Sequence, residues 1–467
     1  MTTDYGEFVA HKLTRQPPTG MITVPDDLHP MLFPFQADLT RWALRRGRAA
    51  IFADTGLGKT LMQLEWAHQV ALHTGRRILI LAPLAVASQT VAMGERMGIA
   101  IGEARSQSDV RMPITITNYE RLHRFDPSKF VGVVLDESSI IKHHDAKTLE
   151  TLLEAFDGFA WKLCATATPA PNDYTELGTH AQFLGICSRS EMLSEYFTHD
   201  GGETQTWRLK KHATAPFWEW VASWAALVTK PSDLGYSDEL YNLPPIEHFQ
   251  HVMPADEAET RAMGRLFAVE ALTLLERRQA RKASVDARVE ACADLVNDDR
   301  QPWVVWCDLN AESEALTKAI PSAVEVRGSQ DIDEKERRLR GFADGQYRVI
   351  VTKPSIAGFG LNWQHAARMA FVGVTDSWEA YYQAVRRCWR FGQHYPVQVH
   401  VFTSEMEGAV IANLKRKEID AANMARELAA MTATTVRQSV QGSVRSTNPY
   451  RPAQGMEVPA WMSSINA

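Results

Sequence analysis

The chain has 467 residues, of which 45% are hydrophobic and 23% charged, a composition typical of a globular protein of roughly two to four domains. Its 50 basic and 56 acidic residues leave a net charge of −6, which argues against a protein that coats nucleic acid but allows a local basic groove. The five cysteines form no Cys-x-x-Cys pair, and we find neither a signal sequence nor an apolar run of ~18 residues, so we expect a cytoplasmic protein without a disulfide framework.

Short apolar runs alternate with helix-length amphipathic segments twice along the chain, which predicts two parallel-sheet lobes. In the first half we expect a helix over 61–74 and strands near 50–53, 78–82, 114–117, 131–135 and 162–165. In the second half we expect strands near 303–306, 324–326, 348–352, 369–372 and 397–401.

The same pattern suggests a domain plan. We expect an N-terminal extension at 1–30 and a first lobe at 31–185. An interlobe helical insertion with a hinge is expected at 186–250, a second lobe at 251–431 and a disordered tail at 432–467. Prolines place the hinge near 228–250. Trp218 and Trp224 within the insertion are at helical spacing and are expected in the core, although aromatics beside basic residues also suit base stacking.

The run Ala53-Asp54-Thr55-Gly56-Leu57-Gly58-Lys59-Thr60 has the spacing of a phosphate-binding loop. It joins an expected strand to an expected helix, so the N–H groups of a glycine-rich turn would point at phosphates. Lys59 would reach the β- and γ-phosphate oxygens, and Thr60 would hold Mg²⁺. Taken alone, the octapeptide could also be a chance glycine-rich turn, and the motifs that follow argue against that alternative.

An acidic pair follows the expected strand at 131–135. Asp136 would bind Mg²⁺ through water, and Glu137 would orient and deprotonate the attacking water. The carboxyl ends of parallel strands are where open α/β sheets place their ligands. A strand that ends in a solvated acidic turn is the alternative. Thr166 and Thr168 follow a further strand, and their hydroxyls could link a nucleotide site to a second ligand site.

The segment from Gln383 to Gln393 carries Arg387 and Arg390, whose spacing of three predicts one helical face. Arginine is the side chain that stabilises the charge building up on a transferring γ-phosphoryl group. Alone, such a helix could equally be a solvated face or a nucleic-acid patch.

In this order the motifs resemble the superfamily-two helicase ATPases, and within them the Swi/Snf-type DNA translocases, over about residues 30 to 425. Gln383-Ala384, Arg387, Arg390 and Gly392-Gln393 fit that family's final motif residue for residue. The chain also looks like the compact DEAD/DEAH-box helicases of bacteriophages and prophages. It departs from the family at Ser139, where His is usual, and at Ala357, where relatives carry Gly.

The resemblance implies two RecA-like α/β lobes in tandem with an ATP cleft between them. It implies that Gln36 reads adenine and that Gln383, Arg387 and Arg390 join Asp136 and Glu137 in catalysis. Nucleotide contacts are implied for Thr55, Gly56, Gly58, Lys59, Thr60 and Gly360, and nucleic-acid contacts for Pro83, Asn118, Thr166, Thr168, Gly358 and Asn362.

We therefore expect a nucleic-acid-dependent ATPase that requires ATP and Mg²⁺ and moves along the DNA backbone. Duplex or forked DNA is favoured over RNA, replication or recombination proteins are possible partners, and no membrane is involved. One alternative is a strand-separating DNA or RNA helicase, for which no long pin-like hairpin is evident. A non-hydrolysing nucleic-acid scaffold is the other, and it would be expected to lack Lys59, Glu137 or the arginines.

Overall fold

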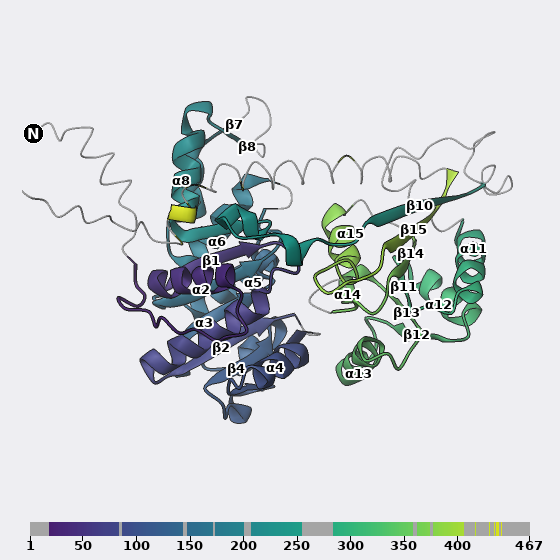
Figure 1. Cartoon of the computed structure of the whole chain (residues 1–467), viewed down its shortest axis with the longest axis horizontal. Helices are drawn as coiled ribbons and strands as arrows, with labels where there is room; N and C mark the ends of the chain where they lie inside the picture. The colour runs from purple at the N-terminus through teal and green to yellow at the C-terminus, as the bar shows by residue number, and fades with distance from the viewer. Residues whose placement is uncertain are drawn as a thin grey trace, which may run out of the picture.

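The computed structural model describes most of the chain, and its two large sheets form two lobes that lie side by side (Figure 1). The described residues are 18–83, 86–142, 147–170, 173–199, 207–254, 284–357, 362–373, 377–405, 416, 429, 434, 436–438 and 440. Both sheets are parallel, and this confirms the expected α/β class with two RecA-like lobes.

The first lobe is built on a parallel sheet of seven strands in the order β3-β4-β2-β5-β6-β1-β9. The strands are β1 (Arg48–Ala53), β2 (Arg77–Ala82), β3 (Ile101–Glu103), β4 (Ile114–Asn118), β5 (Phe130–Asp136), β6 (Trp161–Thr166) and β9 (Ala225–Val228). Helices α2 (Pro34–Arg46), α3 (Lys59–Thr74) and α4 (Ala87–Arg96) pack on one face. The other face carries α5 (Lys147–Ala155), α6 (Leu177–Leu184), α7 (Arg189–Tyr196) and α8 (Thr214–Trp224).

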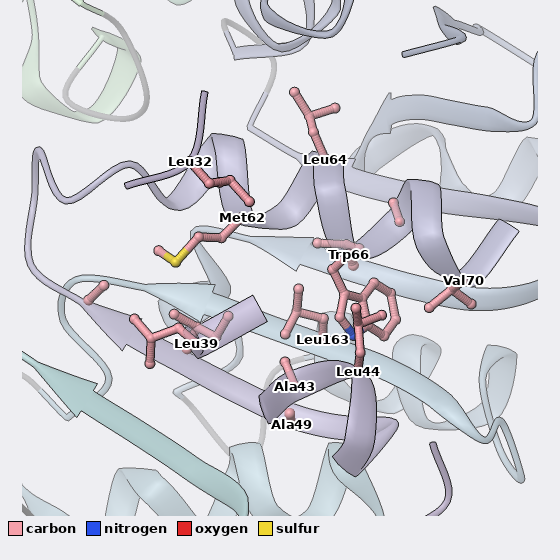
Figure 2. Close-up of a cluster of buried hydrophobic side chains, with 14 of the residues drawn as sticks. Leu32, Leu39, Ala43, Leu44, Ala49, Met62, Leu64, Trp66, Val70 and Leu163 are labelled. Carbon is pink, nitrogen blue, oxygen red and sulfur yellow. The ribbon is translucent and has the colours of Figure 1, made fainter. Parts of the chain in front are cut away.

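Figure 2 shows why α2 and α3 lie against this sheet. Apolar side chains recur at helical spacing on α2, where Leu39 and Ala43 are fully buried, and on α3, where Met62 and Trp66 are fully buried. They meet Leu163 of β6, so the hydrophobic core fixes the start of α3 above the end of β1. That junction is the expected phosphate loop.

The second lobe has a parallel sheet of six strands in the order β10-β15-β14-β11-β13-β12. The strands are β10 (Ile246–Met253), β11 (Trp303–Cys307), β12 (Ala323–Val326), β13 (Val349–Thr352), β14 (Arg368–Val372) and β15 (Val397–Ser404). Helices α11 (Val285–Asp298) and α12 (Asn310–Ala319) cover one face. The opposite face carries α13 (Ile332–Ala343), α14 (Pro354–Ala357) and α15 (Trp378–Val385).

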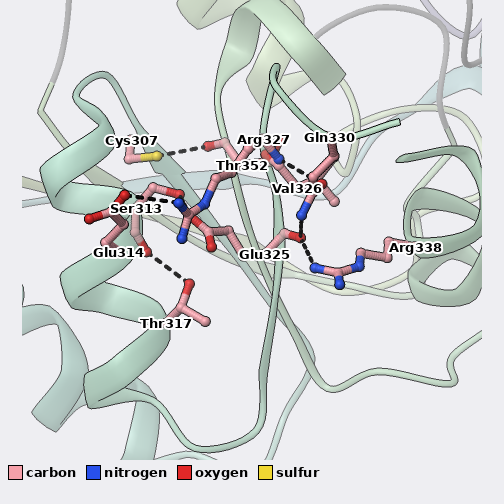
Figure 3. A network of polar contacts seen from close by, with 10 residues as sticks. All are labelled: Cys307, Ser313, Glu314, Thr317, Glu325, Val326, Arg327, Gln330, Arg338 and Thr352. Atoms are coloured by element: carbon pink, nitrogen blue, oxygen red, sulfur yellow. Dashed lines mark hydrogen bonds and ion pairs between the residues drawn. The ribbon is translucent and has the colours of Figure 1, made fainter. Parts of the chain in front are cut away.

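Polar contacts tie the edge of this second sheet to its helices, as Figure 3 shows. The backbone carbonyl of Glu325 in β12 accepts hydrogen bonds from Arg338 of α13 at 2.6 Å and from Gln330 at 3.3 Å. Arg327 pairs with Glu314 of α12 at 2.8 Å. A fully buried pair, Arg288 of α11 with Glu312 of α12 at 2.8 Å, joins the two helices on the other face.

The ten strands expected from the sequence are all present, and the described residues form five further strands that were not predicted. Two of them join the large sheets: β9 extends the first sheet beside β1, and β10 forms the edge of the second sheet beside β15. The others are β3 and a short antiparallel pair, β7 (Phe197–His199) with β8 (Trp207–Leu209), which projects from the first lobe beside α8 (Figure 1).

Candidate functional site

The expected phosphate loop spans the turn from β1 into α3, and its two glycines adopt backbone conformations that other residues rarely take. Gly56 has φ of 91° and Gly58 has φ of 81°. A Cβ atom on Gly58 would lie 2.2 Å from the side-chain nitrogen of Gln36, and one on Gly56 would lie 3.0 Å from the backbone nitrogen of Phe391. The loop therefore requires glycine at both positions.

Lys59 opens α3 and turns its ammonium back over the loop. Its Nζ donates to the carbonyl of Ala53 at 2.9 Å and to that of Asp54 at 3.4 Å. Burial lowers the pKa of Lys59, while the negative charges of Glu137, Asp54 and Asp136 oppose that shift. The ammonium is thus a partly buried cation in the same pocket as the acidic pair.

Asp136 ends β5 inside the lobe and is 7% exposed. Gln63 of α3 donates to its Oδ1 at 2.7 Å, and the Tyr119 hydroxyl donates to its backbone carbonyl at 2.7 Å. Burial, and then repulsion by Glu137, raise the pKa of Asp136 to about 6. Gln63 was not predicted as a site residue, although it lies one helical turn after Lys59 and on the same face.

Glu137 has φ of 50° and ψ of 51° and is the one residue other than glycine with positive φ in the described part of the chain. Such strain concentrates at functional sites, where the surrounding structure must hold it. The next residue is anchored, because the Ser138 hydroxyl lies 3.1 Å from Nε2 of the buried His180 in α6. His180 was not predicted from the sequence.

The second lobe completes the same pocket with Arg387 and Arg390. One pocket is lined by residues of both lobes: Thr55, Gly56, Gly58, Lys59, Thr60, Val86, Gln89, Thr90, Met93, Asp136, Glu137, Asn362, Arg387 and Arg390. Burial lowers the pKa of both arginines, in Arg390 to about 9, where Arg387 adds repulsion and Glu137 opposes it. Both guanidinium groups line the pocket together with the acidic pair.

The helical face expected for these arginines is not formed. Helix α15 ends at Val385 with Arg386 as its C-cap, and the chain then turns. The amide of Trp363 donates to the carbonyl of Arg387 at 2.9 Å, which holds this turn against the preceding strand connection. Gln383 remains on α15, and its side chain lies 3.4 Å from the Thr168 hydroxyl of the first lobe.

The other predicted site residues fall into four groups. The Thr166 hydroxyl accepts from the Thr168 amide at 3.2 Å, so the two threonines form one turn after β6. Pro83 follows β2, and Asn118 is the last residue of β4, where it caps the next turn by accepting from the Arg121 amide at 3.0 Å. Asn362 lines the pocket. Gly358 and Gly360 lie outside the described residues.

Gln36 is buried, and both ends of its amide contact the protein. Its nitrogen donates to the Leu57 carbonyl at 2.9 Å, and its oxygen accepts from the Phe33 amide at 2.9 Å. Adenine recognition by Gln36 stays a prediction. Beside it lies an aromatic cluster that the sequence did not predict: Tyr241 packs against Phe391 at 5.0 Å between ring centroids and against Phe33 at 5.8 Å.

Comparison with known proteins bears on the second lobe. Residues 287–392 match the family model of the helicase conserved C-terminal domain, a range that runs from α11 through Arg387 and Arg390. This match indicates a helicase of superfamily one or two, and such a domain implies nucleic-acid binding. No curated protein matches the chain. Within the described residues, no helix is both long and apolar enough to cross a membrane.

Proposed function

We propose that the protein is an ATP- and Mg²⁺-dependent motor that moves along the backbone of DNA. The observation that carries the proposal is the pocket in which Lys59 and Glu137 of the first lobe meet Arg387 and Arg390 of the second. Such a site is complete only when the lobes are closed, so a cycle of nucleotide binding and release would close and open the cleft.

The residues of this pocket fit a magnesium nucleotide. The two loop glycines have the positive φ values of a glycine-rich turn, and Lys59 supplies a positive charge beside that turn. Thr60 and Asp136 line the pocket with the oxygen ligands that Mg²⁺ prefers. The raised pKa of Asp136 reflects a buried carboxylate that a cation would stabilise as an anion. Bound Mg²⁺ would neutralise charge on the phosphate oxygens.

Each side chain then has a distinct role. Lys59 binds the phosphates, and Glu137 orients the attacking water and accepts its proton. Arg387 and Arg390 stabilise the charge that develops on the transferred phosphoryl group. Gln383 contacts Thr168 of the first lobe, so it is placed to link closure of the cleft to the turn at Thr166.

The preference for duplex DNA rests on the resemblance of the final motif, Gln383 to Gln393, to Swi/Snf-type translocases. Contacts to phosphates carry little sequence information, so we expect low sequence specificity. A strand-separating helicase is the second candidate, and the projecting β7 and β8 pair is the observation that favours it.

The test is the rate of ATP hydrolysis with single-stranded DNA, duplex DNA, forked DNA and RNA in parallel. Lys59→Ala should lose nucleotide affinity, whereas Glu137→Gln should bind ATP and lose turnover, because only Glu137 acts on the attacking water. Arg387→Ala should reduce hydrolysis by a factor on the order of 10³ with a smaller effect on ATP binding. Near-wild-type turnover in Glu137→Gln would refute the assignment.

A second experiment separates translocation from unwinding. A translocase should displace a triplex-forming strand and should be stimulated more by duplex DNA than by RNA. Processive unwinding of long blunt duplexes, or stimulation by RNA equal to that by duplex DNA, would favour the helicase alternative.

A further inference from the structure

Asp54, the second residue of the phosphate loop, makes two side-chain contacts across the cleft. Its Oδ1 accepts a hydrogen bond from the Tyr382 hydroxyl at 2.7 Å and one from the amide of Thr55 at 2.6 Å. Its Oδ2 accepts from Nη2 of Arg386 at 3.0 Å. Tyr382 lies on α15 and Arg386 is the C-cap of that helix, so one carboxylate holds the loop of one lobe to a helix end of the other.

The arginine of this contact is held rigidly. The Arg386 guanidinium lies over the ring of Trp389 at 4.6 Å and over the ring of Tyr382 at 5.1 Å. Its side chain is 11% exposed and that of Asp54 is 26% exposed. A largely buried, charge-assisted hydrogen bond with stacking on both sides is stronger and more directional than a surface ion pair.

The three arginines at the end of α15 therefore have different tasks. Arg387 and Arg390 line the pocket, while the pocket-lining residues do not include Arg386, whose guanidinium is bound to Asp54. The pairing of Arg386 with Asp54 also neutralises a negative charge in the phosphate loop. An unpaired Asp54 carboxylate in a phosphate loop would repel a triphosphate, and Arg386 neutralises it only when the lobes are closed.

We propose that Asp54 is a positioning residue that docks the end of α15 onto the phosphate loop and thereby sets the places of Arg387 and Arg390. The inference rests on the proposed ATP hydrolysis. The contacts of Asp54 with Tyr382 and Arg386 are the geometric basis of the proposal. The phosphate loop would thus also be the surface that positions the turn carrying Arg387 and Arg390.

The first test measures the distance between the lobes without nucleotide. Spin labels on Leu72→Cys and Tyr395→Cys, positions that are 65% and 70% exposed in the first and second lobes, report the separation in a Cys187→Ser background. The labelled chain should give one narrow distance distribution, and adding Asp54→Asn or Arg386→Gln should broaden it and shift it to longer distances. An unchanged distribution in both variants would overturn the proposal.

A matched control uses a second ion pair that joins the described parts of the two lobes. Arg105 of the first lobe and Asp333 of the second lie 2.6 Å apart, but their side chains are 57% and 61% exposed. Exposed pairs contribute little to stability, so Arg105→Gln should leave the distance distribution and the hydrolysis rate unchanged. A shift in this control equal to that of Arg386→Gln would show that any lost contact loosens the cleft, and it would overturn the specific role of Asp54.

The second test is kinetic. Misplacement of a catalytic group by about 1 Å can lower the rate about 100-fold. Arg386→Gln should therefore lower kcat by about 100-fold, and Tyr382→Phe should also lower kcat. In both variants KM for ATP should change by less than about threefold. The double variant Asp54→Asn with Arg386→Gln should be no slower than the worse single variant. Additive losses would overturn the proposal. An inactive wild-type chain would instead refute the proposed function and leave the distance measurement valid.

Discussion

His180 offers a sharp test of how the acidic pair is supported. It lies on α6 with its side chain fully buried, its Nε2 is 3.1 Å from the Ser138 hydroxyl, and its ring packs edge-on against Phe52 at 5.1 Å. Burial lowers the pKa of His180 from 6.5 to about 4. The imidazole is therefore neutral in the folded protein at physiological pH and serves as a hydrogen-bonding partner of Ser138.

The sign and size of the pH effect follow from this shift. Below pH 6.5 the unfolded chain binds a proton at His180 that the folded chain does not bind until the pH nears 4. The contribution of neutral His180 to the free energy of unfolding is thus complete above pH 6.5 and is lost as the pH falls toward 4. The free energy of unfolding should decrease by about 1.4 kcal/mol per pH unit over this window, or about 3 kcal/mol in all.

The assay is urea unfolding of wild type and His180→Gln, monitored on the transition of the first lobe at pH 7.5 and at pH 5.0. Glutamine can keep a hydrogen bond to Ser138 but does not titrate, so the stability gap between the two proteins should shrink by about 2 kcal/mol between these pH values. The matched control is His123→Gln, because His123 is exposed. A gap that stays constant between the two pH values would refute the reasoning.

Three further predictions concern other parts of the molecule. Arg288→Met should lower the stability of the second lobe by about 3–5 kcal/mol in urea unfolding, because it leaves the Glu312 carboxylate buried without its cation, and adding Glu312→Leu should recover much of the loss. Gly58→Ala should abolish binding of a fluorescent ATP analogue, because its Cβ would clash with Gln36 and its φ is positive. DNA affinity measured by anisotropy should fall steeply with added salt, since the contacts are expected to be mainly to phosphates.

The two sheets were predictable because their central strands are continuous apolar runs, as buried parallel strands must be. The missed strands lack that signal. In β10, Glu247, His248, Phe249 and Gln250 are all exposed, because this strand pairs with one neighbour at the sheet edge. In β9, four apolar residues directly follow the apolar helix α8, so periodicity does not separate the strand from the helix.

The candidate site divides in the same way. The loop glycines, Lys59 and the acidic pair are local in sequence, and their spacing alone indicates their chemistry. In contrast, Asp54 contacts Tyr382 and Arg386, which lie 328 and 332 positions further along the chain. No local pattern reports such contacts, because they exist only once the two lobes are placed against each other.

Ser139 shows how a departure from a family pattern can be interpreted through its surroundings. The resemblance predicts a titratable imidazole at this position, and the serine there is 3% exposed and cannot carry charge. An imidazole does reach the residue before it, because α6 brings His180 against Ser138 from the opposite side of the sheet to α3. Since burial keeps that imidazole neutral, its contact with the acidic turn depends on hydrogen bonding rather than on charge. We therefore expect the hydrogen bond between Ser138 and His180 to be insensitive to pH between 7 and 8, a range in which a surface histidine is also mostly neutral. The bond should be lost only when acid unfolds the first lobe.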